Sequence, residues 1–306
     1  IHERLVGSEM CIRDRYGSEN MKFTKNIGFD IQNGILKNKD LFLCPIFIAI
    51  ITFVNFRNQV KQLEVLHMLN PNSVSFADYW FFLYGGMKEY IPSPGNPFLF
   101  PVVWILLFVT PAFLVLNYPV RNMQDIGTQI LVYGKSRSSW WMSKCFWNFI
   151  CTILFHLIIG CLGVLLCMLN KILLSLSFNM DLQSILFAFG METGIKECSA
   201  IPVSAFLLPV LVSAAINLAQ MTFALFVGPM FSFLLCCVFW IVSAYWAQPY
   251  IFGNYAMILR HVWFWNKGVS VNTGLFISVM IITVSLITGL IRFQHYDILN
   301  KNQVNI

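Results

Sequence analysis

The long apolar segments of this chain contain one readily titratable side chain, His156, and no Lys, Arg, Asp or Glu. Hydrolysis inside a membrane would need a nucleophile–base pair, a carboxylate pair or a metal cluster. Cys151 and Cys161 each lie five residues from His156. Because an α-helix repeats about every 3.6 residues, that offset turns each thiol toward a different face. We therefore interpret His156 as a packing residue, and we predict no catalytic residue, no metal ligand and no cofactor.

A second fragment could bind a nucleotide. Residues Tyr133 to Ser136 (YGKS) end like a P-loop, whose pattern is G-x-x-x-x-G-K-[ST]. The first glycine of that pattern would fall at the position of Gln129, and no strand pattern precedes the fragment. We interpret the fragment as a basic turn and predict that the chain does not bind ATP by itself. The cysteines form no C-x-x-C pair, so a zinc or redox site has no support either.

The composition indicates that most of the chain is surrounded by lipid. Of the 306 residues, 58% are hydrophobic and 11% are charged. An ordinary soluble domain carries about 25% charged and about 45–50% apolar residues. The composition excludes a lone soluble enzyme, a disordered chain and a nucleic-acid-binding domain. We predict an all-α integral membrane protein that contacts membrane lipid and no nucleic acid.

The positions of the apolar segments predict six transmembrane helices, because one span needs about 20 apolar residues. They form one membrane unit over residues 41–291 and comprise Leu41–Phe56, Phe98–Asn117, Phe146–Leu169, Val203–Ala219, Phe223–Trp246 and Leu275–Ile291. A short joint near Asn217–Thr222 separates the fourth span from the fifth.

Basic residues and tryptophans give the predicted orientation. Lys and Arg are about twice as dense on the side that holds residues 21–40, the loop 118–145 and the tail 292–306. Basic residues concentrate in cytoplasmic loops, so we expect both termini in the cytoplasm and the chain in the cell membrane. Tryptophans near the predicted span ends are expected at headgroup depth. They are Trp140, Trp141 and Trp147 inside, and Trp246, Trp263 and Trp265 outside.

Residues 1–20 are charged and lack an apolar run, and their string VGSEMCIRDR resembles a translated sequencing adapter. We expect this segment to be a non-native leader that precedes a start at Met21, with a genuine charged leader as the alternative. In residues 21–40, Phe23, Ile27, Ile31 and Ile35 recur every four residues. That spacing is typical of an interfacial helix, which we place on the cytoplasmic side.

Prolines mark the points where helices are expected to bend. Each removes a backbone donor and crowds the preceding turn. The candidates are Pro101, Pro111, Pro209 and Pro229. Such bends suit a conduit that opens and closes, and they also occur in purely structural membrane helices.

The loop between the second and third spans predicts a short amphipathic helix over Val120–Tyr133. Its apolar stripe comprises Val120, Met123, Ile130 and Tyr133, and its polar face comprises Arg121, Gln124, Asp125 and Gln129. A turn at Gly134 and a basic patch at Lys135 and Arg137 follow it.

This loop carries a resemblance to a known family. The pattern D-x-x-G…G-x-S-R-x-x-W-W-x-S-K, together with the basic first helix and six spans, resembles permease subunits of ABC-2 type exporters. In this chain its residues are Asp125, Gly127, Gly134, Ser136, Arg137, Trp140, Trp141, Ser143 and Lys144. The resemblance implies a coupling helix in this loop that inserts into a groove of a separate ABC ATPase subunit. It also implies a second permease chain, identical or different.

The sequence therefore predicts a permease subunit of an ATP-driven exporter, and not an enzyme. The membrane segments lack the carboxylates that ion-coupled transport usually places at depth, so the energy would come from the partner ATPase. The candidate ATPase-coupling residues are Arg121, Asp125, Gly127, Gln129, Gly134, Lys135 and Arg137. The alternative is a non-transporting membrane immunity or sensor protein that binds a peptide or protein partner.

Overall fold

A computed structural model of the chain describes residues 23–70, 73–93, 97–124, 136–187 and 200–296. The regular structure of this described part is all-helical. Its residues form isolated β-bridges but no strand. After a helical region at 23–30, the α-helices are α2 (Asp40–Val65), α3 (Phe76–Tyr84), α4 (Val102–Leu116), α5 (Tyr118–Gln124), α7 (Arg137–Leu169), α8 (Met180–Leu186), α9 (Val203–Val227), α10 (Pro229–Tyr245) and α11 (Val271–Gln294). Shorter elements are η1 (Ile31–Leu36), η3 (Phe252–Ala256) and η4 (Ile258–Arg260).

Among the described residues, five helical segments are long and apolar enough to cross a membrane. They are α2, the segment Val102–Met123 formed by α4 and α5, α7, α9 and α11. The fifth predicted span, Phe223–Trp246, corresponds to α10, which has 17 residues. At 1.5 Å per residue α10 is about 26 Å long, somewhat less than the roughly 30 Å of a bilayer core. The described helices fit a multi-pass membrane protein, and the crossing by α10 stays a prediction.

The boundary between the fourth and fifth spans was predicted wrongly. The fourth helix does not end at Ala219, because α9 continues to Val227. The break falls at Gly228, whose φ of 84° is open to glycine and strained for other residues. Pro229 follows as the first residue of α10, where its missing N–H costs nothing. The predicted joint at 217–222 instead lies within α9.

The other candidate bends divide into two kinds. Pro111 and Pro209 lie inside α4 and α9, where each removes a backbone donor. Pro101 and Pro229 stand at helix starts, so they cannot bend those helices from within. The sequence analysis overlooked Pro45, which lies inside α2.

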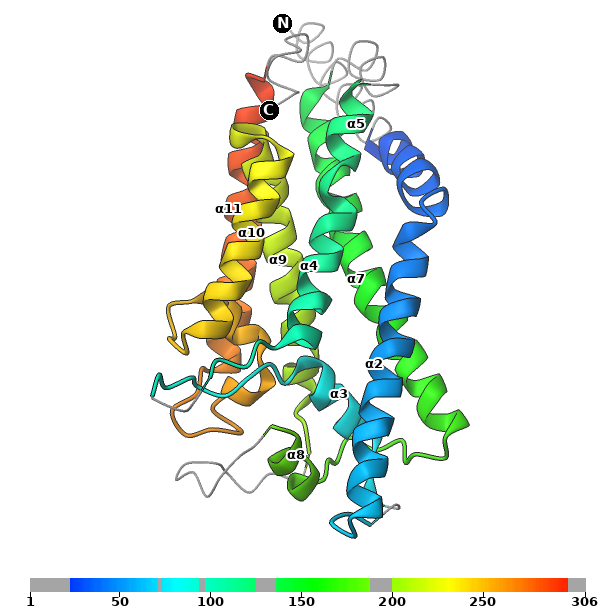
Figure 1. Cartoon of the computed structure of the whole chain (residues 1–306). Helices are drawn as coiled ribbons and strands as arrows, with labels where there is room; N and C mark the ends of the chain where they lie inside the picture. The colour runs from blue at the N-terminus through cyan, green and yellow to red at the C-terminus, as the bar shows by residue number, and fades with distance from the viewer. Residues whose placement is uncertain (1–22, 71–72, 94–96, 125–135, 188–199, 297–306) are drawn as a thin grey trace, which may run out of the picture.

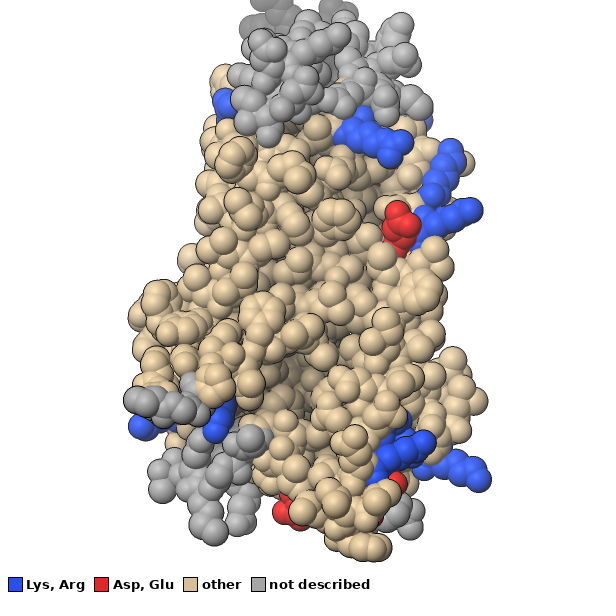
Figure 2. Space-filling view, viewed as in Figure 1, with Lys and Arg blue, Asp and Glu red and all other residues tan. Residues whose placement is uncertain are grey.

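The helices form one elongated bundle (Figure 1). α9 contacts α4, α7, α10 and α11, which places it in the interior of the bundle. The helical region at 23–36, α5 and the end of α11 lie at one end, and α3 and α8 lie at the other. In Figure 2 the middle of the visible face is free of charged side chains, which gather toward both ends.

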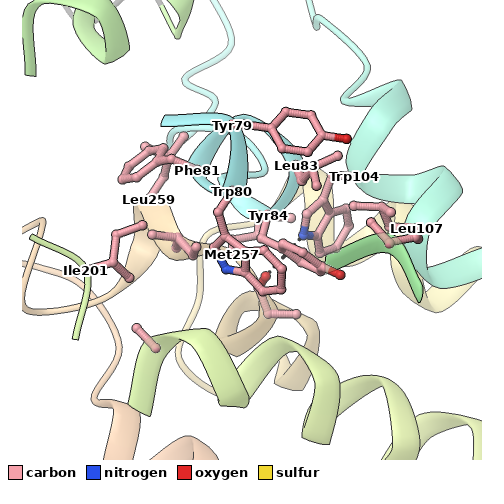
Figure 3. Close-up of a cluster of buried hydrophobic side chains, with 14 of the residues drawn as sticks. Tyr79, Trp80, Phe81, Leu83, Tyr84, Trp104, Leu107, Ile201, Met257 and Leu259 are labelled. Carbon is pink, nitrogen blue, oxygen red and sulfur yellow. Dashed lines mark hydrogen bonds between the residues drawn. The ribbon is translucent and has the colours of Figure 1, made fainter. Parts of the chain in front are cut away.

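The end that holds α3 has a packed core of its own. α3 begins with a capping box. The Ser75 hydroxyl accepts a hydrogen bond from the Asp78 backbone N–H, and the Asp78 carboxylate accepts one from the Ser75 backbone N–H. Its aromatic side chains pack between α4 and the segment that contains η3 and η4 (Figure 3). The residues labelled in that view are Tyr79, Trp80, Phe81, Leu83, Tyr84, Trp104, Leu107, Ile201, Met257 and Leu259. None of the six predicted spans includes α3.

Three predicted interfacial tryptophans are buried inside the protein. Trp140, Trp141 and Trp147 are each at most 2% exposed. Trp140 stacks on Phe293 of α11 at 4.7 Å between ring centroids, and Trp147 stacks on Tyr118 at 4.3 Å. These three rings fill the space between neighbouring helices and do not contact the surroundings of the protein, and their headgroup depth stays a prediction.

Candidate functional site

The predicted coupling loop lies in the chain between α5 and α7. α5 and the start of α7 are at the same end of the bundle. Asp125, Gly127, Gln129, Gly134 and Lys135 lie outside the described residues. Arg121 and Arg137 flank that stretch and are described.

α5 begins one residue after α4, with Asn117 between them. Met123 is 4% exposed and packs in a cluster with Trp140, Trp141 and other apolar side chains, and Val120 packs against the same cluster. Arg121 is exposed. This part of the predicted amphipathic helix therefore turns its apolar side chains toward the bundle and Arg121 away from it.

Arg137 connects the start of α7 to the end of α11. Ser136 is the N-cap of α7 and accepts a hydrogen bond from the backbone N–H of Ser139 at 3.3 Å. The Arg137 Nη1 donates to the backbone carbonyls of Gln294 at 2.7 Å and Tyr296 at 2.9 Å. The last carbonyls of a helix lack intrahelical partners and carry partial negative charge, so a guanidinium there is stabilising.

A buried ion pair lies beside this contact. Lys144 of α7 and Asp30 of the helical region at 23–30 are both 1% exposed, and the ammonium donates to the Asp30 Oδ1. The Tyr118 hydroxyl donates to the same oxygen at 2.9 Å. The Ser143 hydroxyl donates to Oδ2 at 2.9 Å. The carboxylate is therefore fully hydrogen-bonded, which is the condition for a tolerable buried charge.

Aromatic rings surround the ammonium of the pair. The Lys144 Nζ lies 4.9 Å from the ring centroid of Tyr118 and 4.9 Å from that of Trp140. These are cation–π distances. The cluster of Asp30, Tyr118, Ser143 and Lys144 thereby joins three helical segments, and we call it the Asp30–Lys144 cluster.

This cluster was not predicted from the sequence. Lys144 was noted only as the last residue of the loop pattern, and Asp30 was assigned to a surface helix. The local signal for Lys144 is its place between WWMS and CFW, where a charge needs a buried partner. Nothing local identifies Asp30 as that partner, because 114 residues separate the two.

His156 lies deep in the bundle and has a structural environment. Its Nδ1 is 2.8 Å from the Tyr84 hydroxyl, and the rings of Phe108 and Phe155 pack around it. In the part of the chain that the structure describes, no group of three or more His, Cys, Asp or Glu side chains could hold a metal ion.

Polar side chains between the helices hydrogen-bond to one another. The Asn148 Nδ2 donates to the Asn217 carbonyl at 3.2 Å, and the Asn217 Nδ2 donates to the Thr152 hydroxyl at 2.9 Å. These contacts connect α7 to α9 in the interior. Their chemistry positions helices and offers no nucleophile activated by a base.

A second buried charge lies at the opposite end. Arg260 is 2% exposed, and its guanidinium donates to backbone carbonyls of Met87 at 3.0 Å, Ser243 at 2.6 Å and Ala244 at 2.8 Å. Burial lowers the pKa of Arg260 to about 10. Because Ser243 and Ala244 are in the last turn of α10, Arg260 holds the segment of η3 and η4 against the end of that helix.

The chain matches no family model, no curated protein and no solved structure. An assignment of function therefore depends on the sequence pattern and on the geometry described above.

Proposed function

We propose that this chain is the permease subunit of an ATP-driven exporter of the ABC-2 type. In this proposal it forms a substrate pathway with a second permease chain in the cell membrane, and both termini are cytoplasmic. A separate ABC ATPase would contact the loop that contains residues 125–135.

The observation that carries the proposal is how the two flanks of that loop are connected. On one flank, Tyr118 of α5 binds Asp30. On the other, Arg137 binds the end of α11 and Lys144 binds Asp30. A displacement of the loop would therefore reach α4, α7, α11 and the first helix together. Such contacts transmit motion between packed elements, which is the requirement for coupling to an external motor.

The absence of deep charges in the sequence supports an external source of energy. The predicted spans contain no carboxylate, and ion-coupled transporters usually carry ionisable groups at that depth. The interior contacts described above, Asn148 with Asn217 and Thr152, are neutral.

The test is co-purification with an ATPase encoded near this chain, using the wild type and Asp125→Lys. If Asp125 docks in an ATPase groove, reversal of its charge removes a buried interface partner at a cost of about 2–5 kcal/mol. We expect weaker assembly, or ATP turnover that substrate no longer stimulates, with normal membrane insertion. Asp181→Lys, an exposed acidic residue in α8 at the opposite end, is the matched control.

Two results would count against the proposal. If no ATPase co-purifies with the wild type, the exporter assignment fails, and a peptide-binding immunity or sensor protein becomes the better hypothesis. If an ATPase co-purifies equally with both variants, the exporter assignment survives and the role of Asp125 is wrong.

A further inference from the structure

A polar cleft of about 650 Å³ lies between η1, the start of α2 and the junction of α4 with α5. The side chains around it are mostly polar and come from both sides of the cleft. They include Asn33, Lys37, Lys39, Asp40, Asn117, Arg121 and Asn122.

The charges of the cleft favour an anion. Lys37, Lys39 and Arg121 contribute three positive charges against one negative charge from Asp40, and all four side chains are exposed. Neither Lys39 nor Arg121 forms a salt bridge with another described residue. Figure 2 shows Lys and Arg side chains gathered near this end of the molecule, with an acidic side chain beside them.

The oxygen of a buried side-chain amide in the cleft lacks a hydrogen-bond partner among the described residues. Asn122 is 8% exposed, and its Oδ1 has no hydrogen-bond partner among the described residues. A buried polar atom without a partner calls for an explanation, such as a ligand that is absent from the structure. A headgroup hydroxyl or ammonium could donate to this oxygen.

The surface next to the cleft is apolar. Leu43, Phe47 and Ile50 follow Lys39 at helical spacing on α2 and are 47%, 61% and 44% exposed. On α4, Leu114 is half-buried and lines the cleft. Apolar surface that continues directly from a basic cleft matches a ligand with a phosphate at one end and acyl chains at the other.

We propose that this cleft binds the phosphate headgroup of an anionic phospholipid, with the acyl chains against the exposed apolar side chains of α2 and against Leu114 of α4. Basic pockets between membrane helices bind such headgroups through charge and hydrogen bonds. The bound lipid would connect η1 and α2 to the end of α4 and to α5. This inference requires the membrane setting and does not depend on the exporter assignment.

The test is native mass spectrometry of the purified chain in neutral detergent, titrated with phosphatidylglycerol or phosphatidylcholine. We expect one phosphatidylglycerol to bind more tightly than phosphatidylcholine. Each basic residue near a headgroup contributes about fivefold in affinity, so Lys39→Gln/Arg121→Gln should weaken binding at least about tenfold. Lys61→Gln/Lys171→Gln, which removes two exposed lysines elsewhere in the chain, should leave the affinity unchanged.

A second arm separates a lipid from a free phosphate. Phe47→Asn should weaken phosphatidylglycerol binding, and inorganic phosphate or glycerol phosphate should not displace the lipid. Equal affinity of the wild type and the Lys39/Arg121 variant would overturn the proposal. Displacement of the lipid by inorganic phosphate at equal concentration would also overturn it. If the double variant does not fold, the wild type alone decides, because equal binding of the two lipids would also contradict a site for an anionic headgroup.

Discussion

At the scale of single residues, the buried charges of Asp30 and Arg260 are each held by several hydrogen-bond partners. Asp30 receives hydrogen bonds from Lys144, Tyr118 and Ser143, and Arg260 binds a group of carbonyls at the far end. A buried ion pair adds little net stability over an apolar pair of the same shape, but the loss of one partner is costly. The two clusters therefore make the fold sensitive to single substitutions.

The Asp30–Lys144 cluster gives the first prediction. Lys144→Met leaves the Asp30 carboxylate buried without its cation, and we expect a loss of about 3–5 kcal/mol in the free energy of unfolding. Asp30→Asn/Lys144→Met should recover much of that loss, because neither charge remains. The measurement is thermal or denaturant unfolding in detergent for both variants and for Lys37→Met, an exposed control. An unfolding transition of Lys144→Met that matches the control would contradict the burial of the pair.

The second prediction concerns pH and His261, which is fully buried outside the membrane-spanning segments. Its Nε2 donates to the Tyr255 carbonyl at 2.9 Å, and the Trp263 Nε1 donates to its Nδ1 at 3.3 Å. The ring is therefore neutral, and burial lowers the pKa of His261 to about 4 from its ordinary 6.5. Between these two values the unfolded chain binds more protons than the folded one. Stability should therefore fall as the pH falls from 6.5 to 4, by about 3 kcal/mol in total.

Comparison with His261→Gln isolates this effect. The amide keeps a donor for the Tyr255 carbonyl but does not titrate, so its stability should vary less between pH 6.5 and 4. The comparison is needed because burial raises the pKa of Asp78, and that shift acts in the opposite direction. Parallel pH profiles of unfolding for the two proteins would show that His261 does not titrate as argued.

At the scale of elements, close approach decides which helices pair. α11 lies along α9 and also touches α7, where Gly289 meets the ring of Trp141. Small residues at such contacts let membrane helices approach closely. A glycine also sets an element boundary, for a different reason. At Gly228 the positive φ ends α9, and Pro229 starts α10.

The third prediction tests that contact. A Cβ on Gly289 would overlap the Trp141 indole, so Gly289→Ala should destabilise the protein by about 1–3 kcal/mol through overpacking. Gly28→Ala is the matched control, because a Cβ there meets nothing within 4 Å. Alanine is a better helix former, so the control should be neutral or more stable by up to about 1 kcal/mol. The measurement is the free energy of unfolding of both variants in detergent. Equal stability of the two variants would contradict the contact between Gly289 and Trp141.

At the scale of the whole molecule, the ends of the bundle differ in kind. One end contains the Asp30–Lys144 cluster, Arg137 and the cleft proposed to bind a lipid headgroup, and α5 and the start of α7 also lie there. The other contains the aromatic core around α3 and the buried Arg260. The proposed exporter needs the first end in the cytoplasm.

The fourth prediction fixes the orientation in the membrane. If the positive-inside bias holds, Lys171→Cys should react with a membrane-impermeant maleimide in intact cells. Lys37→Cys should react only after the membrane is opened. Both lysines are exposed; Lys37 precedes α2 at one end of the bundle, and Lys171 follows α7 at the other. The unsubstituted chain measures the background from native cysteines, and the reverse labelling pattern would invert the topology.

Apolar runs in the sequence predict the helical character of the chain and most of its helix positions. Runs of apolar residues must satisfy their backbone polar groups internally in a membrane, and a helix does this locally. The Ser75–Asp78 capping box and the Gly228–Pro229 break are also local and could have been read from the sequence. The predicted faces of Val120, Met123 and Arg121 likewise followed from helical periodicity.

The contacts of the site join residues that are far apart in the chain, and no local pattern predicts them. The partner of Lys144 lies 114 residues away, and Arg137 binds carbonyls 157 and 159 residues away. The burial of Trp140 likewise depends on Phe293 of another helix. Periodicity gives the face of a helix on which a residue lies, but not which helix packs against that face. That choice depends on close packing between side chains of distant segments, and it therefore exists only in the folded chain.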